Sequence, residues 1–141
     1  MREIKFRGKI KSGALKGTWV YGFYYENKCS ERAYIIKTLA YYSEVDSDTV
    51  GQFTGLSDIG DNAIYESDIL KTEDGDLYAV YYVEGEWLVG KPSIAKIGLY
   101  YGNLTDISPE KCTVVGNLYD NLELFGESGD NNDSFGRIDC G

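Results

Sequence analysis

The sequence contains no histidine, so the side chain that most often serves as general base and metal ligand is missing. Its three cysteines, Cys29, Cys112 and Cys140, are odd in number and form no Cys-x-x-Cys pair. Neither a zinc site nor a disulfide framework is expected from this set. The sequence therefore predicts free thiols, no metal site and no cofactor.

The motifs that mark common catalytic sites are also absent. Without histidine, a Ser or Cys nucleophile would need lysine or another base beside it, and no Gly-x-Ser-x-Gly sequence is present. The phosphate loops Gly-x-x-x-x-Gly-Lys-Ser/Thr and Gly-x-Gly-x-x-Gly are missing too. We therefore expect a protein that is not an enzyme.

No apolar run approaches the roughly 20 residues that span a bilayer. The first seven residues alternate charged and apolar side chains and lack the apolar stretch of a signal peptide. The expectation is a cytoplasmic protein that does not bind a membrane.

Aromatic residues and glycine are abundant: 13 Tyr, five Phe, two Trp and 17 Gly in 141 residues. Aromatic side chains favour half-buried strands, and glycine favours tight turns. The charge is uneven, because residues 1–43 carry nine Lys/Arg and three Asp/Glu, whereas residues 44–141 carry five and twenty. The net charge of −9 weighs against non-specific binding to a phosphate backbone but leaves room for a local basic face.

The hydrophobic pattern predicts a mostly-β fold of antiparallel strands with short helical turns only. Strands are predicted at residues 4–11, 18–26, 32–42, 49–54, 68–72, 77–84, 86–89, 94–101 and 112–118, and the apolar pattern restarts at Ile64 and Tyr65. Residues 108–111 are predicted to form a helical turn, residues 121–125 a helical turn or a tail, and residues 43–48 a loop. The alternation of strands and Gly turns over residues 68–90 is typical of a small SH3-like barrel.

Residues 1–125 are predicted to form one domain, and residues 126–141 a tail. The tail is polar, acidic and rich in Gly, which predicts disorder. Two isolated apolar residues in it, Phe135 and Ile138, leave open a second interpretation, a docking tail anchored by these side chains.

The N-terminal strands hold the one pattern typical of nucleic-acid binding. A basic groove with stacking aromatic rings is how proteins hold single strands. The alternative is a solvated strand face beside a Tyr-rich core, and the acidic remainder of the chain favours this alternative. The candidate nucleic-acid face comprises Lys5, Arg7, Lys9, Lys11, Tyr21, Phe23 and Tyr25.

Paired carboxylates are common in this chain and say little individually. Glu66 and Asp68 would lie on one side of an extended segment, where they could act as general acid and base. The favoured interpretation is that Asp68 hydrogen-bonds backbone amides and fixes the turn into the next strand. Residues 58–62 lack the spacing of a calcium loop and predict a turn.

Three segments together resemble the YopX family of small phage and prophage proteins. They are the opening Met-Arg-Glu-Ile-Lys-Phe-Arg, the central block from Thr49–Leu56 to Ile64–Leu70, and Val114–Leu124. The resemblance covers about residues 1–125, and the central block is its most specific part. The family's central turn reads Asp-Lys-Asn-Gly-Lys-Glu, whereas this chain has Asp-Ile-Gly-Asp-Asn-Ala at residues 58–63, so no role of the missing Lys and Glu transfers.

The resemblance implies a phage or prophage gene product in a bacterial cytoplasm, with a mostly-β fold that includes an SH3-like barrel. It implies no particular activity. The residues that match the motif are interpreted as structural turn residues: Gly51, Gly55, Asp68, Gly116 and Asn117. The expected function is a non-enzymatic protein-interaction module that binds a host or phage protein through a Tyr-rich surface and acidic loops and can self-associate. The alternatives are a nucleic-acid-binding accessory protein and, third, a carboxylate enzyme using Glu66 and Asp68.

Overall fold

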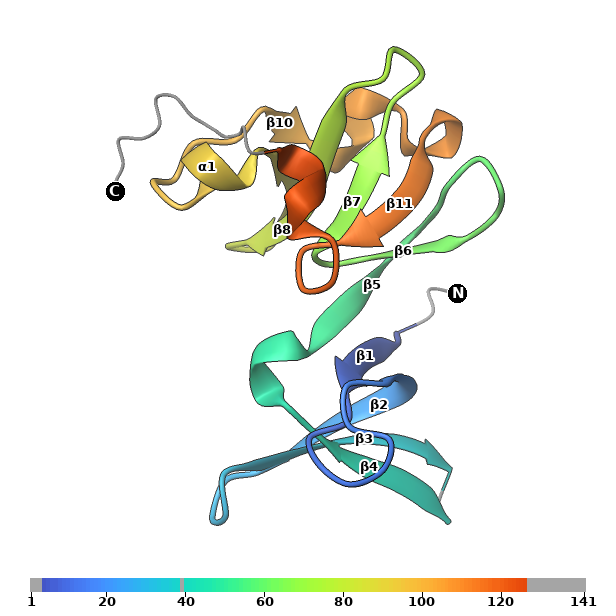
Figure 1. The fold of residues 1–141 in the computed structure, drawn as a ribbon, viewed down its shortest axis with the longest axis vertical. Coiled ribbons are helices and arrows are strands. Elements are labelled where there is room, and N and C mark those ends of the chain that lie inside the picture. The colour runs from blue at the N-terminus through green and yellow to red at the C-terminus, as the bar shows by residue number, and fades with distance from the viewer. Residues whose placement is uncertain (1–3, 39, 127–141) are drawn as a thin grey trace. The chain divides into compact units, whose positions relative to one another are not determined.

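The computed structural model describes residues 4–38 and 40–126, and Figure 1 shows its strands and short helices. The strands are β1 Phe6–Lys9, β2 Trp19–Asn27, β3 Arg32–Thr38, β4 Tyr41–Val45, β5 Gly51–Ser57, β6 Ala63–Tyr65, β7 Asp68–Lys71, β8 Leu77–Val83, β9 Glu86–Gly90, β10 Gly102–Asn103 and β11 Thr113–Asn117. The helices are α1 Pro92–Ala95 and the 3₁₀ turns η1 Ser47–Thr49, η2 Leu104–Ile107, η3 Pro109–Lys111 and η4 Leu122–Phe125. The fold is mostly β, with short helices only, as predicted.

The chain divides into two compact units, Met1–Gly55 and Leu56–Gly141, and the division falls within β5. The division falls inside the range 1–125 that the sequence predicts as one domain. The predicted tail, from residue 127 onward, lies outside the described residues, as do Phe135 and Ile138.

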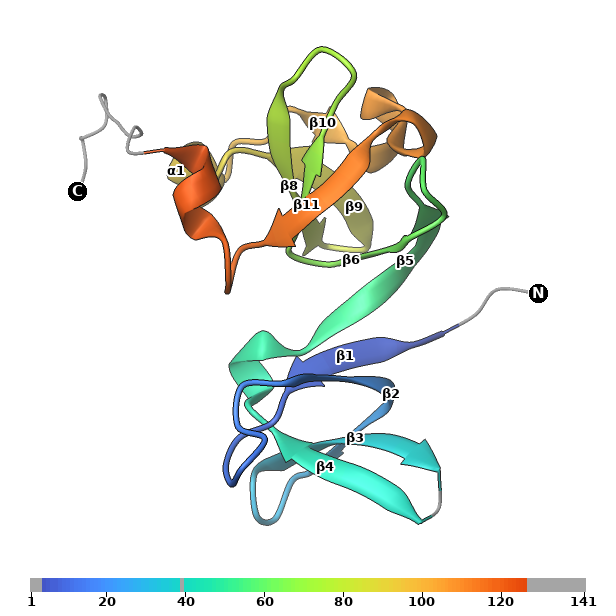
Figure 2. The ribbon, with the colours of Figure 1, turned by 45° about the vertical axis from the view of Figure 1, so that its right-hand side comes forward.

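The strands form two sheets, with the orders β4-β3-β2-β1-β5-β6 and β10-β9-β8-β7-β11. Every strand pairing with a recorded register is antiparallel. A closed SH3-like barrel is not shown, because within the described residues neither sheet closes on itself. The second sheet, seen in Figure 2, ends in β10 and β11 at opposite edges, and β10 is only two residues long.

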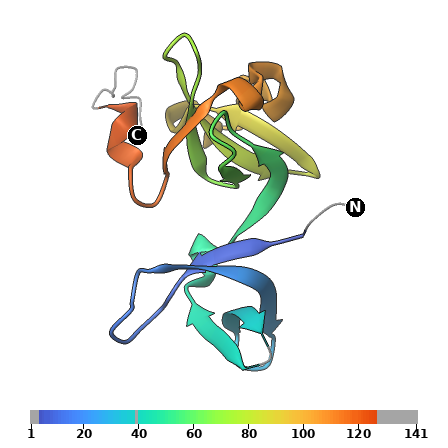
Figure 3. The same cartoon turned by 90° about the vertical axis from the view of Figure 1, so that its right-hand side faces the viewer.

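The first unit builds its core on one face of a curled sheet. Figure 3 shows the blue-to-cyan strands curling until the segment after β1 meets the end of β4, where Ile10 and Val45 form an antiparallel bridge. The Lys11 amide donates to the Glu44 carbonyl at 3.1 Å, and the Asp46 amide donates to the Lys9 carbonyl at 2.9 Å. The buried residues of this core are Ala33, Ile35 and Val45. The half-buried residues that pack against them are Phe6, Val20, Tyr24 and Val50.

The second unit has the larger core, beneath β7, β8 and β9. Burial of these apolar side chains is the main stabilising contribution to the unit. Its buried cluster comprises Ile64, Leu70, Tyr78, Val80, Val89, Leu104 and Cys112. None of the helices in the described part of the chain is long and apolar enough to cross a membrane.

Candidate functional site

The predicted basic face starts on β1, which pairs with β2 in a register that places Arg7 opposite Tyr21 and Lys9 opposite Trp19. Residues directly opposite each other on neighbouring strands share one face of the sheet. The Arg7 guanidinium carbon lies 4.5 Å from the centroid of the Trp19 ring, and Lys9 Nζ lies 5.4 Å from the same centroid. Lys5 Nζ lies 5.7 Å from the centroid of Phe53 on β5. The structure thus brings these three cations together, each against an aromatic ring.

Burial distinguishes the members of this basic set. Arg7 is only 6% exposed, whereas Lys5 and Lys9 are half-buried. Lys11 lies beyond the end of β1, where its Nζ is 3.9 Å from a carboxylate oxygen of Glu44. Arg32 Nε lies 4.0 Å from the same oxygen. These five cations therefore contact rings or a carboxylate of the same unit, and Arg7 is the least exposed of the predicted basic set.

The aromatic members of the predicted set lie on the outer face of the same sheet. Tyr21, Phe23 and Tyr25 alternate along β2 and are 43%, 63% and 50% exposed. The register continues this face across β3 and β4, because Tyr25 pairs with Tyr34, and Ile36 pairs with Tyr42. We call the set Tyr21, Phe23, Tyr25, Tyr34 and Tyr42 the aromatic face.

The rings of the aromatic face contact each other across strands. The rings of Tyr25 and Tyr34 are stacked with centroids 6.3 Å apart, and Tyr42 meets Tyr34 edge-on at 5.9 Å. Such pairs stabilise a sheet by about 0.5–1.5 kcal/mol each. Tyr34 is half-buried between its neighbours, but Tyr42 remains 65% exposed. Sequence reasoning found the β2 residues but missed Tyr34 and Tyr42, because their places on this face follow from the pairing of β3 with β2 and β4.

The candidate acid–base pair, Glu66 and Asp68, lies at the entry to β7. Asp68 is 2% exposed, and its carboxylate accepts a hydrogen bond from the Tyr65 amide at 2.8 Å. A carboxylate that accepts a backbone N–H is held in one place and fixes the turn around it. Neither residue lines the cavity of the second unit described below.

The remaining residues predicted to be structural lie in strands β5 and β11. Gly51 pairs with Arg7 across β1 and β5, and Gly55 has φ +90°, which favours glycine. Gly116 lies at an irregularity between β7 and β11. The side-chain carbonyl of Asn117 accepts from the Tyr119 and Asp120 amides at 3.0 and 2.9 Å.

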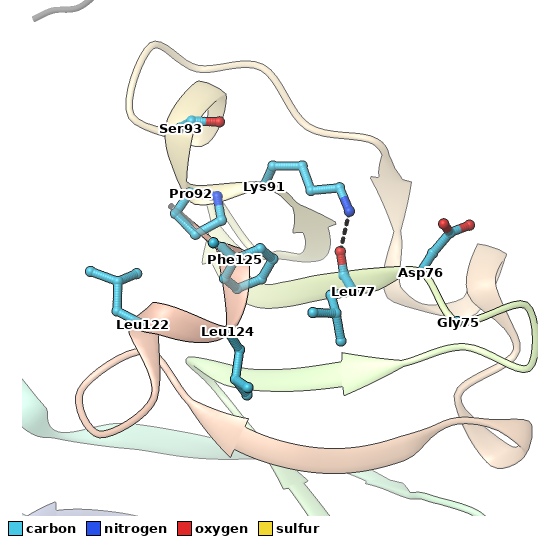
Figure 4. A pocket seen from close by; sticks show the side chains of 10 residues that line it. Gly75, Asp76, Leu77, Lys91, Pro92, Ser93, Leu122, Leu124 and Phe125 are labelled. Atoms are coloured by element: carbon cyan, nitrogen blue, oxygen red, sulfur yellow. Dashed lines mark hydrogen bonds between the residues drawn. The ribbon is translucent and has the colours of Figure 1, made fainter. Parts of the chain in front are cut away.

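A cavity of about 500 Å³ opens in the second unit, and no motif in the sequence indicated it (Figure 4). Three segments supply its walls: the β7–β8 turn, the start of α1, and η4. The lining residues are Gly75, Asp76, Leu77, Lys91, Pro92, Ser93, Leu122, Leu124, Phe125 and Gly126. Burial lowers the pKa of Lys91, and the nearby charge of Asp76 raises it in part.

The part of the chain that the structure describes holds no group of three or more Cys, Asp or Glu side chains placed to bind a metal ion. The exposed Cys29 and the buried Cys112 are both free thiols.

A comparison with protein families matches residues 9–126 to the family described as YopX protein. A comparison with curated proteins finds no significant match.

Proposed function

The chain belongs to the YopX family, and from this premise we propose that it is a non-enzymatic interaction module that binds a partner protein through the aromatic face. The observation that carries the proposal is the row of exposed rings on the outer face of β2, β3 and β4. Aromatic side chains are the residues that most often dominate the energy of an interface.

The aromatic face is not needed to enclose the core of its own unit. That core lies on the opposite face of the sheet, around Ala33, Ile35 and Val45. Covering a side chain such as Phe23 with a partner would remove its exposed apolar surface from water, which contributes about 1.5–3 kcal/mol for a ring that becomes fully buried.

The charge around the face indicates the chemistry of the partner. Residues 1–55 carry nine Lys/Arg and six Asp/Glu, a net +3, whereas residues 56–141 carry five and seventeen, a net −12. The preferred partner is therefore a protein whose apolar patch is bordered by acidic residues, because complementary charges steer association. We propose a host or phage protein in a bacterial cytoplasm as this partner. Self-association of the positive unit with a negative unit of another copy is the competing outcome.

The rings also stabilise the sheet, so the test must separate binding from folding. Phe23→Ser removes a ring that is 63% exposed, and Tyr42→Ser removes one that is 65% exposed. Tyr101→Ser is the matched control, because Tyr101 is 64% exposed but belongs to the second unit.

The experiment is co-purification of the tagged full chain from a bacterial host, with and without nuclease. We expect a discrete protein to survive nuclease, and both face variants to lose it while the Tyr101→Ser control keeps it. Loss of the partner in all three variants, or in none, would exclude the aromatic face as the binding site. A negative result with a wild-type chain that forms dimers in sedimentation would assign the face to self-association.

The second candidate function is binding of single-stranded nucleic acid by the same sheet, and the cluster of Lys5, Arg7 and Lys9 beside the rings favours it. Because Arg7 is buried, the informative variant is Lys5→Glu combined with Lys9→Glu. Binding of an oligonucleotide that survives this change would refute the nucleic-acid function. An enzyme using Glu66 and Asp68 is the third candidate, and the bond of Asp68 to the Tyr65 amide favours a structural role instead.

The origin from a phage or prophage and the SH3-like barrel are parts of this proposal. The barrel is proposed at residues 68–90, and the consecutive antiparallel pairings of β7 with β8 and of β8 with β9 support it.

A further inference from the structure

The cavity of the second unit has the composition of a small-molecule site. At about 500 Å³ it falls within the roughly 300–1,000 Å³ of ligand pockets. Five of its lining residues are apolar: Leu77, Pro92, Leu122, Leu124 and Phe125. Figure 4 shows Pro92 and Phe125 next to Lys91, with Leu122 and Leu124 beyond Phe125, and the Lys91 amine directed to the Leu77 carbonyl.

Lys91 is the one cation among the lining residues. Its Nζ donates a hydrogen bond to the Leu77 carbonyl oxygen and lies 4.5 Å from the centroid of the Tyr78 ring and 5.9 Å from that of Phe125. An ammonium group has three N–H donors, and the Leu77 carbonyl takes one of them. Donor capacity therefore remains for an anion that enters the cavity.

The apolar surroundings of Lys91 strengthen its interaction with an anion. Lys91 is half-buried, and burial lowers its pKa because the charged form loses water. An incoming anion would restore the lost stabilisation in a medium where a charge pair is stronger than in water. The rings of Tyr78 and Phe125 already favour the cationic form from their faces.

We propose that this cavity binds a small apolar monocarboxylate, with the carboxylate on Lys91 and the apolar body against η4 and Pro92. A single negative charge fits best, because Asp76 also lines the cavity and a dianion or phosphate would meet repulsion from it. A neutral or cationic ligand would leave Lys91 without the added partner. The site lies wholly in the second unit, so it stands or falls independently of the aromatic face.

The test uses three probes of one shape: 3-phenylpropionate, 3-phenylpropan-1-ol and 3-phenylpropylamine. Each is titrated to about 10 mM into the isotopically labelled full chain, which would be about nine-tenths saturated at a Kd of 1 mM. Backbone amide shifts and the Lys91 Cε signal are followed by NMR. We expect saturable shifts at residues 75–77, 91–93 and 122–126 with the carboxylate, at least tenfold weaker binding of the alcohol and amine, and a rise in the pKa of Lys91 on binding.

Lys91→Met keeps the aliphatic stem and removes the charge, so it should weaken carboxylate binding at least tenfold. Lys96→Met is the control, because Lys96 is exposed and does not line the cavity. If Lys91→Met fails to fold, Lys91→Arg, which keeps the charge, should retain binding. Equal binding of the three probes, shifts elsewhere on the surface, or no saturable shift with the carboxylate would overturn the proposal.

Discussion

Asp58 offers the sharpest test of the physical account of the second unit. Its carboxylate accepts from the amides of Gly60 at 2.9 Å, Asn62 at 2.8 Å and Val114 at 2.9 Å, and from the Asn62 side chain at 3.3 Å. Asp58 itself is 5% exposed. The carboxylate therefore ties the β5–β6 turn to β11, two segments 56 residues apart.

The expected loss in Asp58→Ala follows from these contacts. A hydrogen bond to a charged group contributes about 1.5–3 kcal/mol, and a buried donor left without an acceptor loses that contribution in full. Val114 is half-buried, but Gly60 and Asn62 are exposed and regain water in the variant. Counting the hydrogen bond from Val114 fully, and those from Gly60 and Asn62 in part, gives a loss of about 3–5 kcal/mol in the free energy of unfolding.

Urea unfolding measures this loss. With Trp19 replaced by Phe, Trp87 is the single tryptophan and reports the second unit through its contact with Tyr82, centroids 4.6 Å apart. An m value near 2 kcal/mol/M converts the loss to a midpoint lower by about 2 M. Asp61→Asn, in the same turn but exposed, is the control and should shift the midpoint by less than about 0.3 M. Equal midpoints for the two variants would refute the role assigned to the Asp58 carboxylate.

Three further predictions concern pH and glycine. Burial raises the pKa of Asp58, but the N–H donors of Val114, Asn62 and Gly60 lower it by more, so its net pKa is depressed. The Asp58 carboxylate contributes stability above the unfolded pKa of about 3.9, and this stability is lost as pH falls through the folded pKa. The urea midpoints of wild type and Asp58→Asn should therefore converge below about pH 4. A gap between the two midpoints that stays constant with pH would contradict this prediction. Gly22→Ala places a Cβ 2.3 Å from the Ile36 carbonyl oxygen. The variant should therefore destabilise the first unit by about 2–3 kcal/mol and disrupt the aromatic face, as measured by Trp19 fluorescence during unfolding. An unchanged unfolding midpoint would show that β3 moves freely to accommodate the methyl group. Gly116→Ala places a Cβ 2.5 Å from the Asn121 side-chain oxygen, which accepts a hydrogen bond from the Asn117 amide at 3.1 Å. Thermal unfolding of this variant should show a loss of about 1–2 kcal/mol in stability. Full stability would mean that the Asn121 hydrogen bond is dispensable.

Local patterns predicted much of the fold. Alternation over residues 4–11 and the aromatic run 18–26 correspond to β1 and β2, and the acidic Gly turn at residues 73–76 joins β7 to β8. Ser108 and Pro109 begin η3 as their order predicts, although Ser108 makes no side-chain capping bond. Turn chemistry and period-2 patterns act within a few residues, which is why they can be read from the chain.

The incorrect predictions of secondary structure fall on segments whose local sequence pattern is compatible with two different structures. The run from Ile94 to Tyr101 predicts a strand, but Pro92 at the first helical position starts α1, and Gly98 at φ +87° turns the chain afterwards. The run at residues 32–42 predicts one strand, but β3 ends at Thr38 and β4 begins at Tyr41, so the predicted loop at 43–48 contains the end of a strand. These choices depend on what each segment packs against.

The candidate site likewise combines features that the sequence predicts with features that depend on how distant segments pair. Alternation places Lys5, Arg7 and Lys9 on one face from the sequence alone, but their contacts with Trp19 and Phe53 depend on the register of β1 with β2 and β5. The cavity around Lys91 joins residues 75, 91 and 125, and no spacing rule relates positions so far apart.

The two described thiols differ in a way that suits chemical labelling. Cys29 is exposed in the turn between β2 and β3, whereas Cys112 is buried and burial raises the pKa of its thiol. Maleimides react with the thiolate, so in a Cys140→Ser background a dye would attach to Cys29 and spare Cys112. The turn continues the strand that carries Tyr25, so this dye would report partner binding at the aromatic face by a change in anisotropy, without altering any ring.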